Sequence, residues 1–359
     1  MPQLSLFDAA APIIERLSGQ RHQHRPAPLA IPIFSALALL QKSVRRNEAA
    51  FALSAASTLL DQSPDRLFRR LAAISVEDSG LANLPLVEFA VSSSASRTFR
   101  KRLGGDWPVA AALVTALCRS EKDRSADDAY IVAKNHIELA DLRASLGKLT
   151  APELVELLRD RRATFTRAIA AWRAAGADWN ERGSPVGKAI PKLVFATLGE
   201  TGTSAATVSL ASRAFTQTRE ALAPVLAVLE PLRPSGVLDT VDDELPPTML
   251  GDDGLPLWRH DKFSHAGIAA IKTLLGRPCE FSRWVRDHIE PRKRLRFAGE
   301  ALFRVESGLT LRRVQYPAAQ TLRRLADENF HGLRLTDPRK PLELLRNDLP
   351  LLNEVRHHV

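Results

Sequence analysis

Hydrophobic positions recur at helical spacing from residue 33 onward. Phe34, Leu37, Leu40 and Val44 lie three or four residues apart, so they fall on one face of a helix. Similar stripes predict further helices over residues 51–60, 64–74, 109–118, 126–146, 151–175, 186–198 and 204–232. Strand-like alternation is rare in this part of the chain. The pattern therefore predicts a mainly α, multi-helical fold.

Two local patterns add detail to this picture. Thr150-Ala-Pro-Glu153 has the spacing of a capping box, which predicts a helix start at that point. Residues 303–311 read Phe-Arg-Val-Glu-Ser-Gly-Leu-Thr-Leu, and hydrophobic and polar positions alternate around Ser307-Gly308. That alternation predicts one small β-hairpin.

Breaks in the helical pattern divide the chain into segments. Residues 1–32 lack sustained periodicity and contain several prolines, which predicts a flexible tail. Residues 239–256 hold six acidic residues, no basic residue and several helix breakers, which predicts an exposed acidic linker. Two helical domains are expected around this linker. The first covers 33–148 with a helical domain or extension over 149–238, and the second is a basic helical domain over 257–359.

Composition limits the class of protein. The 359 residues are 45% hydrophobic and 25% charged, as in an ordinary globular protein of two or three domains. No stretch has the apolar length of a membrane span, so no membrane partner is expected. Cys118 and Cys279 are the only cysteines and lie far apart, which suits neither a disulfide framework nor a zinc site. A cytoplasmic location follows as an expectation.

Positive charge is concentrated in the C-terminal part of the chain. The whole sequence has 50 Lys and Arg against 41 Asp and Glu, and residues 283–346 alone have 15 against 8. A local excess of this kind favours polyanions such as DNA, although an arginine-rich solvated surface has the same composition. Nucleoid association in the cytoplasm is the corresponding expectation.

The N-terminal pentapeptide is the most specific motif. It consists of Gln3, Leu4, Ser5, Leu6 and Phe7. Leu4, Leu6 and Phe7 are apolar side chains that gain free energy by burial in a partner, at roughly 1.5–3 kcal/mol each. Gln3 can both donate and accept a hydrogen bond. All five positions resemble the peptide with which many bacterial replication and repair proteins bind the sliding clamp. The resemblance implies the sliding clamp as a partner; the alternative is a helix start packed on the protein's own core.

Three blocks in the first helical domain resemble a second known family. They are residues 38–46 (ALLQKSVRR), 69–71 (RRL) and 75–82 (SVEDSGLA). They are similar to the C-terminal region of the RarA/MgsA clamp-loader-like ATPases over about residues 34–136. In that family the region is a helical collar that assembles tetramers. The resemblance implies a collar-like fold for residues 33–148, a replication-fork setting and self-association into a homo-oligomer.

The ATPase module of that family has no counterpart in this sequence. A P-loop needs Gly-x-x-x-x-Gly-Lys-Ser/Thr to hold phosphate and Mg²⁺. The nearest candidate, Gly183-Ser-Pro-Val-Gly187-Lys188-Ala189, is one residue short and ends in alanine. The sequence therefore predicts no ATPase activity and no cofactor.

Several polar residues are weaker candidates for binding. Basic clusters that can contact nucleic acid are Lys42, Arg45, Arg46, Arg292, Lys293, Arg294 and Arg296. The first three are alternatively a solvated turn. Trp258, Phe281 and Trp284 near the second cluster can stack on unpaired bases, or belong to the core. We interpret Glu77 and Asp78 as partners of Arg69 or Arg70, or as helix caps, rather than as metal ligands.

Catalytic chemistry has one candidate. Asp261 and His265 are four residues apart, so on a helix they share a face and can form an acid–base pair. Two groups are too few for a stable metal site. The favoured interpretation is that Asp261 caps a helix beginning near Phe263, with His265 packed beside it. No recognisable catalytic motif is present, so the protein is not expected to be an enzyme.

The leading hypothesis is a non-enzymatic accessory protein of DNA replication or repair. It binds the sliding clamp through residues 3–7 and contacts DNA or a fork protein with its basic C-terminal half. The alternatives are an enzyme that processes nucleic acid with Asp261 and His265, and a self-assembling scaffold.

Overall fold

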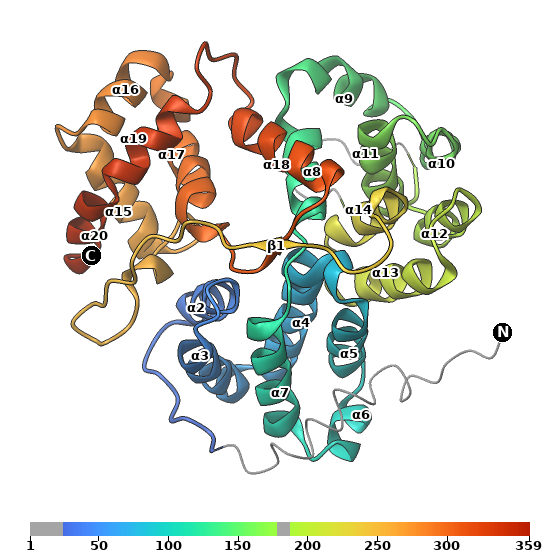
Figure 1. Ribbon diagram of the computed structural model, residues 1–359, viewed down its shortest axis with the longest axis horizontal. Helices are drawn as coiled ribbons and strands as arrows, with labels where there is room; N and C mark the ends of the chain where they lie inside the picture. Colours follow the sequence, from blue (N-terminus) through green and yellow to red (C-terminus); the bar gives the residue numbers. More distant parts are fainter. Residues whose placement is uncertain (1–23, 178–186) are drawn as a thin grey trace.

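The computed structural model describes residues 24–177 and 187–359. Helices account for most of these residues, and the two strands are only two residues long each. The mainly α fold is therefore confirmed (Figure 1). None of the described helices combines the length and the hydrophobicity that a bilayer-crossing segment requires. The pentapeptide 3–7 lies outside the described residues.

Six helices build the first hydrophobic core. They are α2 (Ile33–Arg45), α3 (Ala49–Gln62), α4 (Pro64–Ile74), α5 (Leu84–Ala95), α6 (Arg97–Arg102) and α7 (Asp106–Arg119). Leu40 and Val44 of the predicted stripe are fully buried in this core. The stripe is not buried throughout, because Phe34 is 64% exposed and Leu37 is only partly buried.

A π-helical turn, Ser75–Ser79, and a 3-10 turn, Gly80–Ala82, connect α4 to α5. Gly80 has φ of +46°, and a Cβ atom at that position would lie 2.5 Å from the carbonyl oxygen of Asp123. The chain can therefore approach residue 123 this closely only at a glycine. This contact brings the π-helical turn against the segment that begins α8.

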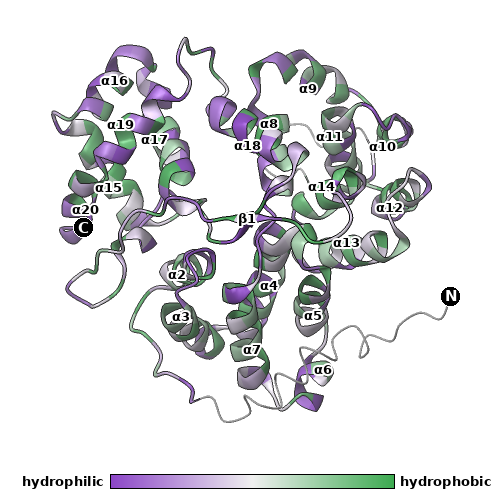
Figure 2. Ribbon diagram, viewed as in Figure 1, coloured by the Kyte–Doolittle hydropathy of each residue, from purple (hydrophilic) through white to green (hydrophobic). Residues whose placement is uncertain are grey.

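The second core gathers helices from the middle of the chain around α14, whose residues are all buried. Its elements are α8 (Ser125–Asn135), α9 (Ala140–Leu146), α10 (Ala151–Glu156), α11 (Thr164–Ala175), α12 (Pro191–Glu200), α13 (Ala205–Thr218) and α14 (Leu222–Leu229). Ala129 of α8 and Leu154 of α10 belong to the same cluster, so the boundary expected at residue 148 falls inside a continuous core. Figure 2 shows the hydrophobic positions of α14.

The capping box at Thr150 is present, with Thr150 and Glu153 exchanging hydrogen bonds. The single long helix expected over 151–175 is wrong. A 3-10 turn follows α10, Asp160 has extended backbone angles, and α11 starts only at Thr164. Residues 159–162 read Arg-Asp-Arg-Arg, and all four are exposed, so nothing packs there to hold a helix together.

The third core contains most of the C-terminal part of the chain. It comprises α15 (His265–Gly276), α16 (Glu280–His288), α17 (Arg294–Leu302), α19 (Lys340–Asn347) and α20 (Leu349–His357). The remaining helix, α18 (Pro317–Asn329), packs instead on α8 and contributes Leu322 to the second core. Figure 1 shows α18 beside α8, apart from α16 and α19.

The hairpin expected over residues 303–311 is wrong. Phe303–Ser307 continue α17 as a π-helical turn, because Leu302 and Val305 are buried in the third core at helical spacing. The antiparallel ladder joins distant segments: β1 (Thr240–Val241) pairs with β2 (Arg313–Val314), with Thr240 opposite Val314. The local alternation therefore suggested pairing between neighbouring residues, whereas the strand after residue 310 pairs with β1, a distant segment.

Part of the segment that we expected as an exposed linker is buried. Asp243 is 8% exposed, and its Oδ2 forms an ion pair with Arg313 Nη2 at a distance of 3.0 Å. Its backbone N–H also donates to the carbonyl oxygen of Thr310 at 3.0 Å. The segment thus lies across the centre of the molecule, where Figure 1 shows β1 between the helical groups.

The described part of the predicted tail is held against α3. Arg25 Nε donates to Ser57 Oγ at 3.0 Å, and Arg25 also pairs with Asp61. Leu29 N–H donates to Thr58 Oγ1 at 2.8 Å. Residues 24–32 are therefore anchored, which corrects the expectation of a tail that is flexible as far as residue 32.

Candidate functional site

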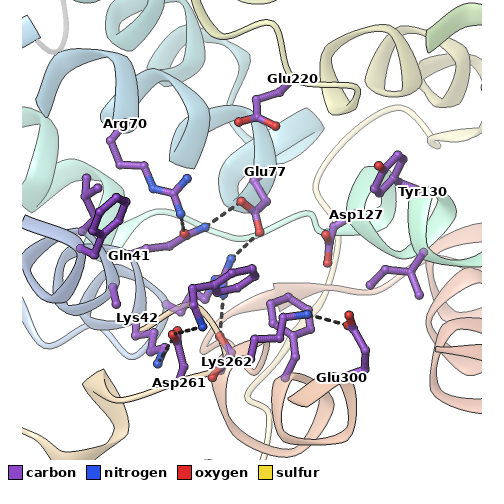
Figure 3. A pocket seen from close by; sticks show the side chains of 18 of the residues that line it. Gln41, Lys42, Arg70, Glu77, Asp127, Tyr130, Glu220, Asp261, Lys262 and Glu300 are labelled. Atoms are coloured by element: carbon purple, nitrogen blue, oxygen red, sulfur yellow. Dashed lines mark hydrogen bonds and ion pairs between the residues drawn. The ribbon is translucent and has the colours of Figure 1, made fainter. Parts of the chain in front are cut away.

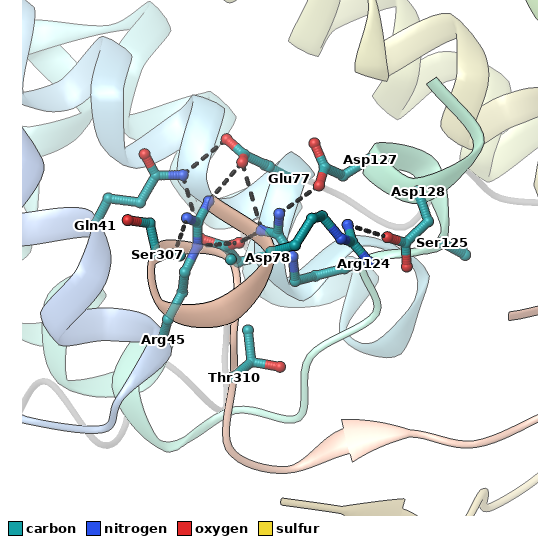
Figure 4. A network of polar contacts seen from close by, with 12 residues as sticks. Gln41, Arg45, Glu77, Asp78, Arg124, Ser125, Asp127, Asp128, Ser307 and Thr310 are labelled. Carbon is teal, nitrogen blue, oxygen red and sulfur yellow. Dashed lines mark hydrogen bonds and ion pairs between the residues drawn. The ribbon is translucent and has the colours of Figure 1, made fainter. Parts of the chain in front are cut away.

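A buried network of ion pairs lies where the three cores meet (Figure 4). Arg45 Nε donates to Asp78 Oδ1 at 2.9 Å, and Arg124 donates to the same oxygen. Arg124 also pairs with Asp127. Arg124 is 1% exposed and Asp78 is fully buried. The network therefore connects α2, the π-helical turn 75–79 and the start of α8.

The network continues into the C-terminal part of the chain. Arg304 Nη1 pairs with Asp128 Oδ1 at 2.9 Å, and Arg304 Nη2 pairs with Asp327 Oδ1 at 2.6 Å. Arg313 pairs with Asp243, as described above. Charges buried in pairs cost desolvation free energy, which offsets much of their attraction. Their main effect is to specify how the cores are positioned, because a displaced core would leave charges unpaired.

Burial and charge act in opposite directions on two carboxylates beside this network. Burial disfavours ionisation of Glu77, but Arg45 and Arg124 outweigh it and lower the pKa of Glu77 to about 2. Burial dominates at Asp127 despite the attraction of Arg124, and raises its pKa to about 6. The two acids line the same cavity and differ in proton affinity.

A cavity of about 650 Å³, here called the junction cavity, opens beside the network. It is bordered by α2, the turn 75–79, α8, the segment before α15, and α17. In Figure 3, Glu220, Glu77 and Asp127 lie on one side, opposite Lys42, Asp261 and Lys262. The volume is that of a site for a small organic ligand.

Aromatic side chains line the junction cavity. Phe34 is 64% exposed and Phe263 is 69% exposed, and these are the two exposed phenylalanines of the described chain. Lys262 Nζ lies 4.9 Å from the ring centre of Phe263 and 5.0 Å from that of Phe303. Two large apolar rings left in water at one cavity are the kind of surface that a ligand or partner covers.

Two polar atoms in the lining of the junction cavity have no hydrogen-bond partner among the described residues. Arg70 Nε and Ser307 Oγ are buried without a hydrogen bond. Glu220 lines the same cavity, and burial raises the pKa of its carboxyl group. Buried polar atoms are normally satisfied, so these two atoms are exceptions in the wall of the junction cavity.

A smaller cavity of about 280 Å³ adjoins the junction cavity; we call it the basic groove. The two share Lys134, Asn135, Arg296 and Glu300. The charged side chains of the basic groove are four cations and one carboxylate: Lys134, Arg143, Lys293, Arg296 and Glu300. His331 also lines it, and its Nε2 is buried without a hydrogen-bond partner.

The first cluster of predicted nucleic-acid contacts does not face solvent. Lys42, Arg45 and Arg46 are 4%, 3% and 7% exposed. Lys42 Nζ pairs with Asp261 Oδ2 at 2.8 Å, and burial lowers its pKa. Arg46 Nε pairs with Glu48 Oε1 at 3.0 Å. Neither the expected contact with DNA nor a solvated turn fits this placement, because each cation is itself buried and already paired with a carboxylate.

Glu77 and Asp78 are structural, as expected, but their partners are not Arg69 or Arg70. Both carboxylates pair with Arg45 and Arg124. Arg70 instead donates to Gln41 Oε1, and Gln41 Nε2 donates to Glu77 Oε2 at 2.7 Å. Arg124 is distant in sequence, so local spacing did not indicate it.

The second basic cluster is divided among different roles. Arg292 and Lys293 both pair with Glu290, at 2.9 and 3.2 Å. Arg294 Nε donates to the carbonyl oxygen of Ile289 at 2.9 Å, beyond the end of α16. Arg296 is exposed and has no ion pair in the described chain; it faces both cavities. The cluster therefore contributes Lys293 and Arg296 to the site.

Asp261 and His265 do not form an acid–base pair. Asp261 is buried and paired with Lys42, while His265 is exposed at the first residue of α15. The helix cap is Ser264, whose Oγ accepts from Gly267 N–H at 3.0 Å. Asp261 Oδ1 accepts from Phe263 N–H at 2.9 Å, one turn earlier than a cap. The capping role expected for Asp261 is therefore filled by Ser264.

The predicted aromatic contacts belong mainly to the cores. Phe281 and Trp258 are buried, and Arg46 lies over the Trp258 ring with its Cζ 5.4 Å from the centroid. Trp284 stacks on His288 with ring centres 4.4 Å apart. The junction cavity is instead lined by Phe34, Tyr130, Phe263 and Phe303, which the sequence did not single out for binding.

No group of three or more potential metal ligands occurs among residues 24–177 and 187–359. The P-loop-like segment lies mostly outside these ranges, and its described end leads into α12. No known protein family, curated protein or solved structure matches the chain. The junction cavity and the basic groove are therefore interpreted from their own geometry.

Proposed function

We propose that the protein is a non-catalytic accessory factor of bacterial DNA replication or repair that binds the sliding clamp through residues 3–7. The observation that carries the proposal is the pentapeptide Gln3-Leu-Ser-Leu-Phe7, which matches the clamp-binding pattern at every position. Its three apolar side chains would be buried in a pocket of the clamp. Gln3 would fix the register with hydrogen bonds.

The anchoring of Arg25 supports this arrangement. Arg25 and Leu29 are hydrogen-bonded to α3, so the folded body begins at a defined point. Residues 8–24 separate Phe7 from that point, and a chain of this length spans at most about 60 Å. A peptide on such a tether can bind one site of a ring while the body reaches DNA nearby. Equivalent sites on the ring would raise the apparent affinity of a weak peptide.

DNA contact in this proposal belongs to the C-terminal part of the chain. Arg296 and Lys293 line the basic groove. Self-association through the collar-like helices and location at the nucleoid belong to the same proposal. Asp261 and His265 no longer favour the enzyme alternative, because Asp261 is held by Lys42.

The test is binding of the purified full chain to immobilised sliding clamp. We expect the wild type to bind and the double variant Leu6→Ala/Phe7→Ala to lose binding. Ile13→Ala/Ile14→Ala is the matched control, because it removes two large apolar residues from the same segment outside the motif. Equal loss in both double variants, or no binding by the wild type, would overturn the proposal.

A further inference from the structure

We propose that the junction cavity binds the base of an unpaired nucleotide of single-stranded DNA, and that the basic groove binds phosphates of the same strand. This inference extends the proposed function, because it names the form of DNA that the protein holds near the clamp. It rests on four features of the two cavities.

The first feature is the pair of exposed rings at the junction cavity. Phe34 and Phe263 come from α2 and from the segment before α15, and both line the cavity while remaining largely in water. Every base has a flat π-face, so aromatic side chains bind unpaired bases with little regard to sequence. A base between these segments would cover apolar surface that the protein itself leaves exposed.

The second feature is the set of unsatisfied polar atoms inside the junction cavity. Arg70 Nε is a donor, and Ser307 Oγ is both a donor and an acceptor. Glu220 lines the same cavity and adds a carboxyl group to this set. The edge of a base presents ring nitrogens, carbonyl oxygens and amino groups, which complement such a mixed set. A purely apolar ligand would leave these groups unpaired, which costs free energy.

The third feature is the difference in charge between the two connected cavities. The junction cavity contains carboxylates as well as cations, including Glu77, Asp127 and Glu220. The basic groove has four cations and only Glu300 as a carboxylate. A nucleotide has the same division, with a neutral base joined to a charged phosphate. Lys134 and Arg296 line both cavities and so mark the point where base and phosphate would meet.

The fourth feature is accessibility. The base-binding groups lie inside a cavity, and Arg70 Nε and Ser307 Oγ are buried. A base within a duplex cannot reach such atoms unless it is unpaired and turned out of the stack. The site therefore selects unpaired nucleotides.

The experiment measures fluorescence anisotropy of a labelled single strand of about 16 nucleotides with the full chain. A blunt duplex of the same sequence and a mixture of free deoxynucleoside monophosphates serve as competitors. We expect the unlabelled single strand to compete more strongly than either. A duplex that competes equally well would overturn the selection of unpaired bases. Free nucleotides that compete as well as the strand would overturn the strand as the ligand.

Variants then locate the site. Phe263→Ala should weaken strand binding by roughly 5- to 150-fold, the range for loss of one stacked base, and Phe263→Tyr should restore it. Arg296→Gln should weaken binding and reduce its dependence on salt, because one phosphate contact is lost. Arg292→Gln is the matched control and should change binding far less, since Arg292 pairs with Glu290 and lines neither cavity. Equal effects of Arg296→Gln and Arg292→Gln, or no effect of Phe263→Ala, would overturn the site.

Clamp binding by the same variants separates this inference from the proposed function. Phe263→Ala should bind the clamp as the wild type does, because Phe263 and residues 3–7 are separate in sequence and serve different partners. A wild type that binds the clamp but not the strand overturns the nucleotide site and leaves the clamp proposal standing. A variant Phe263→Ala that loses the clamp instead identifies the rings as a protein-binding surface and overturns the nucleotide site.

Discussion

Arg356 and Glu306 form a two-point ion pair in the interior, with Arg356 Nη1 and Nη2 at 2.8 and 2.7 Å from the two carboxylate oxygens of Glu306. The side chains are 0% and 3% exposed. The pair joins α20 to the π-helical turn 303–307, so the last helix is held against the segment that borders the junction cavity.

Removing one partner of this pair should be strongly destabilising. Arg356→Ala leaves the Glu306 carboxylate buried without its cation, and we expect the free energy of unfolding to fall by about 3–5 kcal/mol. The double variant Glu306→Leu/Arg356→Met should recover much of that loss, because no charge is then left unpaired. Urea unfolding of the three proteins measures both effects. A double variant less stable than Arg356→Ala would contradict this explanation.

The close approach at the start of α15 makes a second prediction. A Cβ atom on Gly267 would lie 1.9 Å from the carbonyl oxygen of Asp261, which no small shift relieves. Gly267→Ala should therefore destabilise the protein by about 1–3 kcal/mol, although alanine usually favours a helix over glycine. Gly276, the last residue of the same helix, has open space around its Cβ position. Gly276→Ala should be neutral or stabilising by up to about 1 kcal/mol.

Thermal unfolding of the two glycine variants measures this difference in stability. The two changes add the same methyl group to the same helix, so they differ only in surroundings. If both variants had the same melting temperature, the close contact between Asp261 and Gly267 would be absent from the protein in solution.

His331 gives the protein a dependence on pH. Burial lowers the pKa of His331 to about 4, below its ordinary value of 6.5. Its Nδ1 accepts from Leu333 N–H at 2.9 Å, so protonation of that nitrogen would break the hydrogen bond. The unfolded chain binds the proton more readily than the folded one. The contribution of neutral His331 to the free energy of unfolding should therefore be fully present above about pH 6.5, and it should decrease as the pH falls toward 4.

The variant His331→Asn tests this linkage. The asparagine side-chain oxygen can accept from Leu333 N–H but does not titrate in this range. The difference in unfolding free energy between the wild type and the variant should shrink or reverse as the pH falls from 6.5 to 4. A difference that stays constant over this window would rule out His331 as a source of the pH dependence. His260 has a similarly lowered pKa of about 4 and keeps its contribution in both proteins.

The sequence indicated local features of the fold well. Helix periodicity found α2 through Leu40 and Val44, and spacing alone identified the Thr150–Glu153 capping box. It failed where distant contacts decide the structure. The alternation around Ser307 suggested a hairpin, but burial of Val305 in the third core favours a helical turn. Pairing of β2 with β1 depends on residues about 70 positions earlier, which no local pattern indicates.

The candidate site was only partly predictable for the same reason. Arg296 and Lys293 could be chosen from the density of basic residues. Arg45 could not be distinguished from them, because its burial depends on Asp78 and on the distant Ser307, whose carbonyl oxygen accepts from Arg45 at 2.6 Å. Phe34 had the spacing of a core residue, and only the fold shows that it faces a cavity. No sequence signal marked Glu220.

The pair of Lys42 and Asp261 separates a structural role from a catalytic one. Lys42 Nζ lies 2.8 Å from Asp261 Oδ2, and both side chains are 5% exposed. If Asp261 were a catalytic acid or base, Asp261→Ala would abolish an activity and leave folding intact. From the buried pair we expect the opposite, namely a loss of stability. Asp261→Ala leaves Lys42 buried without its partner and should lower the free energy of unfolding by about 3–5 kcal/mol.

The double variant Lys42→Met/Asp261→Asn removes both charges and keeps an acceptor for the Phe263 N–H group. We expect it to be markedly more stable than Asp261→Ala in urea unfolding, because no buried ion is left alone. It should also bind the clamp as the wild type does, since neither residue lies in the pentapeptide. Were Asp261→Ala as stable as the wild type, the pair would not support the fold, and the acid–base interpretation of Asp261 would regain its basis.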